Sequence, residues 1–396
     1  MPDKTPIDVL ENVWWIGAVS LAVSLVVTPM VRYLAYRLHV VDRPDDDGEG
    51  LKPHARPVAY LGGLAMCVGA LAGLACYLAV MPDRGLQWRR LEEALPAGNL
   101  EAVMVNPIWN LLAVALAFVV ITLVGLLDDL RDIRPSRKVL GQVFAALILL
   151  VGGVGYRMAQ VFFRVLHMAP PEWVLVPVSA VVVLVAVVCA CNATNLLDGL
   201  DGLCGGVTGI ISLGFLALAV HLAMYPFDGP HQLRVALCLA MTGAVLGFLP
   251  YNVPPASIFM GDAGSMLLGF FVATMMALFS REGNLRWLVA ACAVFALPIL
   301  DTSLAVVRRL LAGKSIFHGD RSHLYDQLVD RGMTVKQVVG LFYVLAAVSA
   351  AIGVACAIYL RGRYAVVLYA VLLAIIWAVF HKLGMIRPAS KTPGRE

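Results

Sequence analysis

The sequence predicts an all-α, polytopic membrane protein, and its apolar composition is the main observation behind this fold class. Of the 396 residues, 60% are hydrophobic and 14% are charged, whereas a soluble globular protein is nearer one half apolar and one quarter charged. Apolar runs of about 20 residues fill most of the chain, and a run of that length crosses a bilayer as a helix. Acidic residues border several of these runs directly, which predicts a functional site at the membrane boundary.

About eleven transmembrane helices are expected. The expected spans are residues 13–35, 58–80, 108–128, 138–156, 173–191, 204–224, 233–250, 264–280, 285–307, 337–360 and 364–383. The gaps between them are too short for a soluble domain, so residues 1–386 are expected to form a single integral-membrane domain. Residues 82–107 and 157–171 are expected on the outer side, the first with a short helix, and the polar residues 387–396 as a disordered cytoplasmic tail.

The distribution of basic residues predicts which side of the membrane each loop faces. Most of the 30 Lys and Arg lie in the loops after spans one, three and nine and in the C-terminal tail. Because cytoplasmic loops carry the excess of Lys and Arg, these segments are expected in the cytoplasm. The net charge of +4 and the lack of a basic-aromatic pattern give no sign of nucleic-acid binding. The eight cysteines have no zinc-like spacing and are expected to be small buried hydrophobes.

Three acidic clusters at the ends of spans carry the strongest functional signal. They are Asp128-Asp129-Leu-Arg-Asp132 after span three, Asn195-Leu-Leu-Asp198-Gly-Leu-Asp201-Gly202 after span five, and Phe259-Met-Gly-Asp262 before span eight. An acid beside hydrocarbon is costly to desolvate, so each cluster marks a functional-site hypothesis. Because all three are expected on the same side of the membrane, they predict one shared site for a divalent cation.

The spacing within each cluster leaves a functional and a structural interpretation open. Asp128 and Asp132 share a face if span three continues as a helix, and Asn195, Asp198 and Asp201 neighbour one another if they also lie on a helix. The glycines around the second cluster permit a ligand to approach the backbone closely. Helix caps and an interfacial turn are the structural alternatives, and the acid before span eight can serve as an N-cap or as a metal ligand.

Basic residues gather in two further loops on the same side. The loop after span nine holds Arg308, Arg309, Lys314, His318, Asp320, Arg321, His323, Tyr325 and Asp326. Arg suits bidentate recognition of phosphate or sugar, and His donates to phosphate near neutral pH, so this loop predicts an anion site, with a solvated loop as the alternative. The loop after span one supplies Lys52, His54 and Arg56, which either meet an anionic ligand or only set the topology. Asp301 is a further acid inside span nine and is given no role.

Together these groups predict phosphoryl transfer. Acids, neighbouring bases and glycine turns occur without a nucleophilic Cys or Ser motif, and in phosphoryl transfer positioning and charge neutralisation by Mg²⁺ supply most of the catalysis. A site at the membrane boundary further predicts one soluble and one lipid-borne substrate. An ion-coupled transporter is the alternative from another class, but transporter acids are expected near mid-membrane rather than at the ends of spans.

The motifs resemble those of the polyprenyl-phosphate N-acetylhexosamine-1-phosphate transferases, the family that includes MraY, WecA and TagO. The resemblance extends from Lys52-Pro-His-Ala-Arg-Pro-Val-Ala-Tyr-Leu-Gly-Gly63 through the three acidic clusters to Asp320-Arg-Ser-His323. It implies transfer of a sugar 1-phosphate from a UDP-sugar to undecaprenyl phosphate, which gives a lipid-linked diphosphate sugar and UMP and initiates a cell-envelope polysaccharide. It also implies Mg²⁺ as cofactor, with Mn²⁺ as a substitute, a bacterial inner-membrane location with the site facing the cytoplasm, and a homodimer.

The same resemblance implies a role for each matched residue. Asp262 and Asn195 would be metal ligands. The catalytic group would comprise Asp128, Asp129, Asp198 and His323, in which Asp128 acts near the lipid phosphate as a base or as a positioning group. The residues that bind substrate would be Lys52, Lys138, Asn195, Gly199, Asp201, Asn252, Phe259 and Arg321.

The loop after span nine indicates which branch of the family the chain resembles. Its Arg308-Arg-Leu-Leu-Ala-Gly-Lys-Ser-Ile-Phe run and the eleven expected spans favour the WecA/TagO-like branch, because MraY members have a His-His-His run and ten spans. UDP-N-acetylglucosamine (UDP-GlcNAc) is therefore the expected donor, and the MraY reaction with UDP-MurNAc-pentapeptide is the alternative. The chain departs from the branch at Tyr325-Asp326, where a His-His pair is usual, and this departure leaves the donor sugar open.

Overall fold

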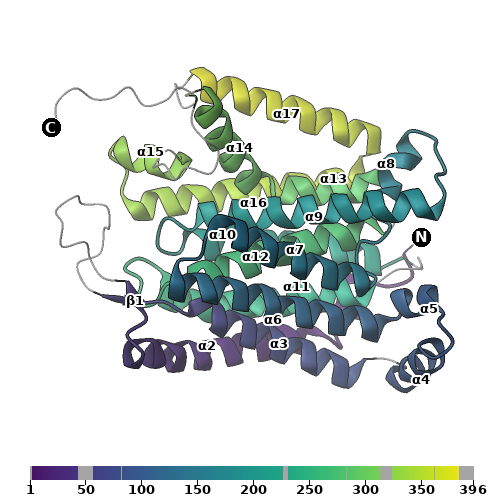
Figure 1. Ribbon diagram of the computed structural model, residues 1–396. Helices are drawn as coiled ribbons and strands as arrows, with labels where there is room; N and C mark the ends of the chain where they lie inside the picture. Colours follow the sequence, from purple (N-terminus) through teal and green to yellow (C-terminus); the bar gives the residue numbers. More distant parts are fainter. Residues whose placement is uncertain are drawn as a thin grey trace.

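The chain folds into a bundle of helices that lie side by side, as the sequence predicts (Figure 1). The computed structural model describes residues 2–42, 57–81, 83–225, 231–281, 283–311, 313, 323–360 and 362–382. The helices are α1 (Pro6–Leu10), α2 (Trp14–Arg37), α3 (Gly62–Val80), α4 (Arg84–Ala94), α5 (Leu100–Val105), α6 (Pro107–Arg131), α7 (Pro135–Val151), α8 (Gln160–Val165), α9 (Glu172–Leu197), α10 (Leu203–Ala223), α11 (His231–Asn252), α12 (Gly261–Ser280), α13 (Leu285–Val294), α14 (Ala296–Leu311), α15 (Leu324–Asp330), α16 (Val335–Tyr359) and α17 (Gly362–Lys382). Two short strands, β1 (Val41–Asp42) and β2 (Val58–Ala59), pair in antiparallel orientation. The expected tail, residues 387–396, lies outside the described residues.

Eight of the described helices are long and apolar enough to cross a membrane, and there are nine if α13 and α14 count as one span. The eight are α2, α3, α6, α9, α10, α11, α12 and α16. The chain is therefore a polytopic helical membrane protein. The two other expected spans fall on helix α7, which has 17 residues, and on an apolar part of α17, residues 364–379, that is also short for a span. Because the described helices do not reach eleven, the number of spans gives no support to either branch of the family.

The ninth expected span is broken rather than continuous. Helices α13 and α14 meet at an angle of 73° on either side of Phe295. Pro298 explains the break, because a proline has no N–H to donate and its ring clashes with the carbonyl four residues earlier, here that of Val294. Helix α13 ends at Val294, and the proline lies in the first turn of α14, where its missing N–H costs little.

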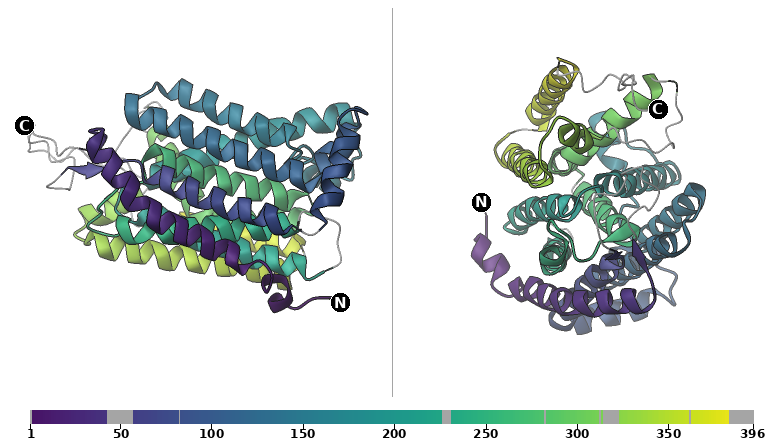
Figure 2. Two further views of the ribbon diagram at one scale, coloured as in Figure 1. Left: turned by 90° about the horizontal axis from the view of Figure 1, so that it is seen from below. Right: turned by 90° about the vertical axis from the view of Figure 1, so that its left-hand side faces the viewer.

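Helix α12 is the centre of the bundle. All of its apolar window is buried inside the protein, against 33% for α9 and for α16. It packs against α3, α6, α9 and α13, and Figure 2 shows the bundle along its length and from one end. Gly125 permits a close approach of α6 to α12, because a Cβ atom at this position would lie 2.5 Å from the backbone of Ala263.

The chain direction brings the three acidic clusters to one end of the bundle. Helices α6 and α9 end there and α12 begins there, beside β1 and α15, while α4, α5 and α8 lie at the other end (Figure 1). The expected outer segments 82–107 and 157–171 contain the short helices α4 and α5 and the short helix α8, respectively. The fold therefore supports the prediction that the clusters share one site.

The close approach of α6 and α12 is testable by adding one methyl group. Gly125→Ala is expected to lower the thermal unfolding midpoint of the purified protein, because overpacking of this kind costs about 1–3 kcal/mol and exceeds the gain that alanine brings to a helix. Gly340→Ala on α16 is the matched control, since a Cβ there meets no atom within 4 Å. Equal midpoints for the two variants would contradict the packing described.

Candidate active site

The centre of the site is an ion-pair cluster of two carboxylates around one ammonium group. The Nζ atom of Lys138, in the first turn of α7, contacts Oδ2 of Asp128 and lies 2.7 Å from Oδ2 of Asp262. Asp128 is 8% exposed and Asp262 is 23% exposed, so the second carboxylate is the more accessible to a ligand. The turn that joins α6 to α7 begins at Asp132, whose left-handed backbone (φ 46°) ends α6, so Asp132 does not continue the helical face of Asp128.

Asp129 holds the N-terminus of α12. Its carboxylate accepts hydrogen bonds from the backbone N–H of Asp262 at 2.7 Å and of Ala263 at 3.1 Å. Gly261 has a φ of +67°, and a Cβ there would lie 2.5 Å from Asp129, so the approach requires glycine. The sequence allowed Asp262 to be the cap of this helix. Because α6 supplies the cap instead, the side chain of Asp262 is directed to the ion-pair cluster.

Asn195 joins the cluster from α9. Its Nδ2 atom donates to Oδ1 of Asp262 at 2.8 Å and to Oγ of Ser265 at 3.1 Å. The structure therefore brings together Asp128, Asp129, Lys138, Asn195 and Asp262, all of which the sequence selected. Ser265 was given no role from the sequence, although it belongs to the same motif as Asp262.

Asp198 and Asp201 lie in a turn and not on a helix. Helix α9 ends at Leu197, and α10 begins only after Gly202, so the expected helical spacing of the second cluster is wrong. Removal of the carboxyl from water raises the pKa of Asp198 well above its usual range, and the carboxylates of Asp262, Asp129 and Asp201 raise it further. The three neighbouring carboxylates make the surroundings of Asp198 negatively charged.

Asp201 and Asn252 connect this turn to the segment before α12. Oδ2 of Asp201 accepts from the N–H of Ala256 at 2.8 Å. The Asn252 side chain accepts from the N–H of Gly202 at 3.1 Å and donates to the carbonyl of Ile258 at 3.0 Å. Both side chains therefore bind backbone atoms of the turn after α9 or of the segment before α12. These two segments are called the rim of the site.

Phe259, in the segment before α12, belongs to the same rim, and its backbone bonds to the end of β2 and to the start of α3. Its N–H donates to the carbonyl of Ala59 at 2.8 Å, and its carbonyl accepts from the N–H of Gly62 at 2.9 Å. Its ring is 5.8 Å from the ring of Tyr60. The sequence predicted that Phe259 contacts substrate, and the structure places it beside a second aromatic side chain that the sequence did not select.

The segment after α14 reaches the site through His323 and Tyr325. The two rings are stacked, with centroids 5.5 Å apart and an interplanar angle of 6°. The hydroxyl of Tyr325 donates to the carbonyl of Leu196 at 3.0 Å, and a Cβ on Gly199 would lie 2.2 Å from that hydroxyl. Gly199 is therefore required for packing against the tyrosine. Two selected residues, Lys52 and Arg321, lie outside the described residues.

The donor set of the cluster fits Mg²⁺. Within the described part of the chain, no three His, Cys, Asp or Glu side chains form a group that could hold a metal by themselves. Mg²⁺ prefers oxygen ligands and is usually bound by one or two carboxylates together with water and substrate phosphates. Asp128 and Asp262 already converge on one cationic atom, so the site offers the carboxylates and leaves the other positions to the substrate.

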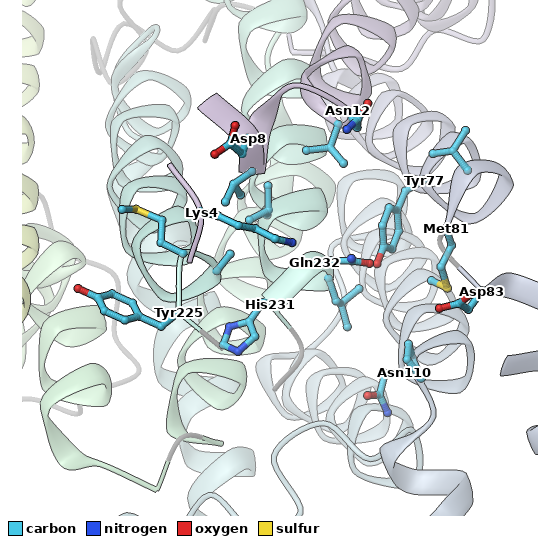
Figure 3. A pocket seen from close by; sticks show the side chains of 18 of the residues that line it. Lys4, Asp8, Asn12, Tyr77, Met81, Asp83, Asn110, Tyr225, His231 and Gln232 are labelled. Atoms are coloured by element: carbon cyan, nitrogen blue, oxygen red, sulfur yellow. The ribbon is translucent and has the colours of Figure 1, made fainter. Parts of the chain in front are cut away.

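A cavity at the opposite end of the bundle is separate from this site. It has a volume of about 850 Å³, and Figure 3 shows Lys4, Asp8, Tyr77 and His231 among the side chains that line it. None of the described residues that were predicted for the site lines this cavity. Its volume therefore says nothing about the chemistry of the acidic clusters.

The chain is similar to known proteins over most of its length. Residues 111–280, from within α6 to the end of α12, match the model of glycosyl transferase family 4. The chain is 34% identical to the undecaprenyl-phosphate alpha-N-acetylglucosaminyl 1-phosphate transferase of Salmonella typhi, over 82% of this chain and 78% of the relative. It is 32% identical to the decaprenyl-phosphate N-acetylglucosaminephosphotransferase of Mycobacterium leprae (strain TN), over 89% and 86%. It is also 32% identical to the phospho-N-acetylmuramoyl-pentapeptide-transferase of Staphylococcus aureus (strain bovine RF122 / ET3-1), over 63% and 75%.

The role of Asp129 as the cap of α12 is testable by a change of one atom. Asp129→Asn replaces one acceptor oxygen with an NH₂ group that faces a backbone N–H, and loss of an N-cap acceptor costs about 0.5–2 kcal/mol. The thermal unfolding midpoint is therefore expected to fall. Asp132→Asn is the control, because Asp132 is an exposed acid of the same cluster. An equal midpoint for the two variants would show that the cap contributes nothing.

Proposed function

We propose that this chain, which belongs to glycosyl transferase family 4, transfers N-acetylglucosamine 1-phosphate from UDP-GlcNAc to undecaprenyl phosphate. The family makes it a phosphoglycosyl transferase of cell-envelope biogenesis that uses a UDP-N-acetylhexosamine and a polyprenyl phosphate. The two relatives named for N-acetylglucosamine transfer match 82% and 89% of the chain, against 63% for the relative named for the pentapeptide substrate. This difference supports N-acetylglucosamine as the sugar and leaves the pentapeptide reaction as the alternative.

The observation that carries the proposal is the convergence of Asp128, Lys138 and Asp262 at the end of the bundle where α6, α7 and α12 meet. Phosphoryl transfer depends on positioning and on neutralisation of charge, with little covalent chemistry by the protein. A fixed ammonium group between two carboxylates gives the site a cation at a defined place. The same cluster offers oxygen ligands for a second, exchangeable cation.

The reaction forms and breaks one bond at the phosphorus that bears the sugar. An oxygen of the lipid phosphate attacks that phosphorus, a new P–O bond forms, and the bond to the oxygen of UMP breaks with its electron pair leaving on UMP. A phosphate monoester is largely ionised near neutral pH, so the attack needs no strong base. We therefore assign Asp128, which is held by Lys138 and by the N–H of Ile133 at 3.0 Å, to positioning rather than to proton removal.

Asp262 and Asn195 are the proposed ligands of Mg²⁺, with Mn²⁺ as a substitute. When bound there, the ion would supply positive charge that offsets the charge of the phosphoryl groups. The hydrogen bond of Asn195 to Asp262, at 2.8 Å, already aligns the two side chains. Asp198, whose N–H donates to the carbonyl of Asn195 at 3.2 Å, is proposed to act near the diphosphate.

The rim residues are proposed to bind the uridine part of the donor. Phe259 and Tyr60 offer aromatic faces for a base. Gly199, Asp201 and Asn252 shape the turn after α9 and the segment before α12, which together form the rim. Lys52 and Arg321, outside the described residues, remain proposed phosphate contacts.

The orientation of the protein is proposed from its basic residues. Most Lys and Arg lie in the loops after spans one, three and nine and in the C-terminal tail, and cytoplasmic loops carry such an excess. The acidic clusters are expected on the same side, so this bias supports a site that faces the cytoplasm, where a soluble nucleotide sugar can reach it. We propose that α7 and α17 also cross the membrane, and that two copies associate as a homodimer.

The proposed reaction is tested with purified protein, Mg²⁺, labelled UDP-GlcNAc and undecaprenyl phosphate. We expect UMP release in step with label entering the lipid, and loss of both when Mg²⁺ is chelated. Decaprenyl phosphate in a parallel assay measures the preference for acceptor length. Transfer from UDP-MurNAc-pentapeptide but not from UDP-GlcNAc would instead establish the alternative reaction.

The metal assignment is tested by Asp262→Asn. Loss of this carboxylate is expected to lower turnover about 100-fold or more, because it weakens binding of the cation that would stabilise the developing negative charge, while the protein still folds. Asp83→Asn, at the opposite end of the bundle, is the matched control and is expected to leave turnover unchanged. Undiminished Mg²⁺-dependent transfer by Asp262→Asn would contradict the assignment.

A further inference from the structure

Asp301 is a buried acid in the broken span, and it has two bonding partners in the segment that follows α14. It is 1% exposed. Oδ2 lies 2.8 Å from Nδ1 of His323, and Oδ1 accepts a hydrogen bond from the N–H of Leu324 at 2.8 Å. An ionisable group in a membrane span is costly unless it is paired, and such pairs occur at functional sites.

The imidazole of His323 is fixed from a second direction as well. Its ring stacks on Tyr325, whose hydroxyl donates to the carbonyl of Leu196 at 3.0 Å. Leu196 is the neighbour of Asn195 in the last turn of α9. The contacts therefore run from Asp301 through two rings to the end of the helix that supplies the proposed metal ligand.

We propose that Asp301 is a positioning residue that fixes the tautomer and the orientation of His323, so that the imidazole acts on a phosphate group of the donor through Nε2. This inference rests on the proposed function for the identity of the ligand. An imidazole has two polar atoms, and a carboxylate at Nδ1 keeps a proton on that atom. Nε2 then remains for the substrate, and the carboxylate compensates a positive charge on the ring when Nε2 also carries a proton.

A purely structural role for the pair makes a different prediction. If Asp301 only joins α14 to α15, its loss lowers stability and does not depend on the chemistry of the imidazole. If it acts through His323, its loss has no further effect once the imidazole is gone. The distinction is therefore measured by coupling between the two residues.

The test compares Asp301→Asn, His323→Gln and the double variant in the transfer assay. Asparagine keeps the shape of the side chain, but its NH₂ group donates to Nδ1 and imposes the opposite tautomer. We expect the kcat of Asp301→Asn to fall about 10- to 100-fold, as when a side chain loses the partner that orients it, with a smaller change in KM. The double variant is expected to be no slower than His323→Gln. Asp301→Glu, which keeps a carboxylate, is expected to recover part of kcat, and it serves as the second variant if the asparagine variant does not fold.

A second readout needs no turnover. Imidazole ¹⁵N NMR of histidine-labelled protein, with His323 identified by its absence in His323→Gln, is expected to show a proton on Nδ1 that moves to Nε2 in Asp301→Asn. Multiplicative losses in the double variant, or wild-type kcat and an unchanged tautomer in Asp301→Asn, would overturn the inference. Wild-type protein that shows the Nδ1 proton but transfers no sugar would support the pairing and overturn the proposed function, so the two failures are distinguishable.

Discussion

The hydrogen bonds of Asp129 to the first amides of α12 are the contact on which the arrangement of the site depends. The first turn of a helix leaves its N–H groups without partners, and α12 is buried along its whole length, so those groups need an acceptor from elsewhere in the protein. A carboxylate is the best acceptor at this position, because it also meets the positive end of the helix dipole. By taking that acceptor from α6, the fold fixes the start of α12 against the end of α6.

The adjacent acids of α6 therefore perform two different tasks. Successive residues of a helix point in directions about 100° apart, so Asp128 and Asp129 cannot face the same partner. Asp129 binds the backbone of α12, while Asp128 faces Lys138 and, across the ammonium group, Asp262. The relative placement of Asp128 and Asp262, the carboxylates proposed to act in the site, thus depends on the backbone contact that Asp129 makes.

The sequence predicts the parts of this site that depend on composition and local pattern, and it misses those that depend on contacts between helices. Apolar runs followed by acids predict the fold class and bring Asp128, Asn195 and Asp262 to the same end of the bundle. The cap supplied by Asp129 is not visible locally, because its partner is more than 130 residues away. Pro298 is a local signal for the break between α13 and α14, whereas the pairing of Asp301 with His323 joins residues 22 positions apart and has no such signal.

The tyrosine that departs from the family pattern shows why one residue cannot be judged in isolation. From the sequence, Tyr325 replaces an imidazole and leaves the donor sugar open. In the structure its hydroxyl binds the carbonyl of Leu196, its ring supports His323, and Gly199 leaves room for it. Each contact is with the backbone or with a face of a ring, so none of them requires a charged group at position 325. The tyrosine thus attaches the start of α15 to the end of α9 and supports the ring of His323, the imidazole proposed to act on the substrate.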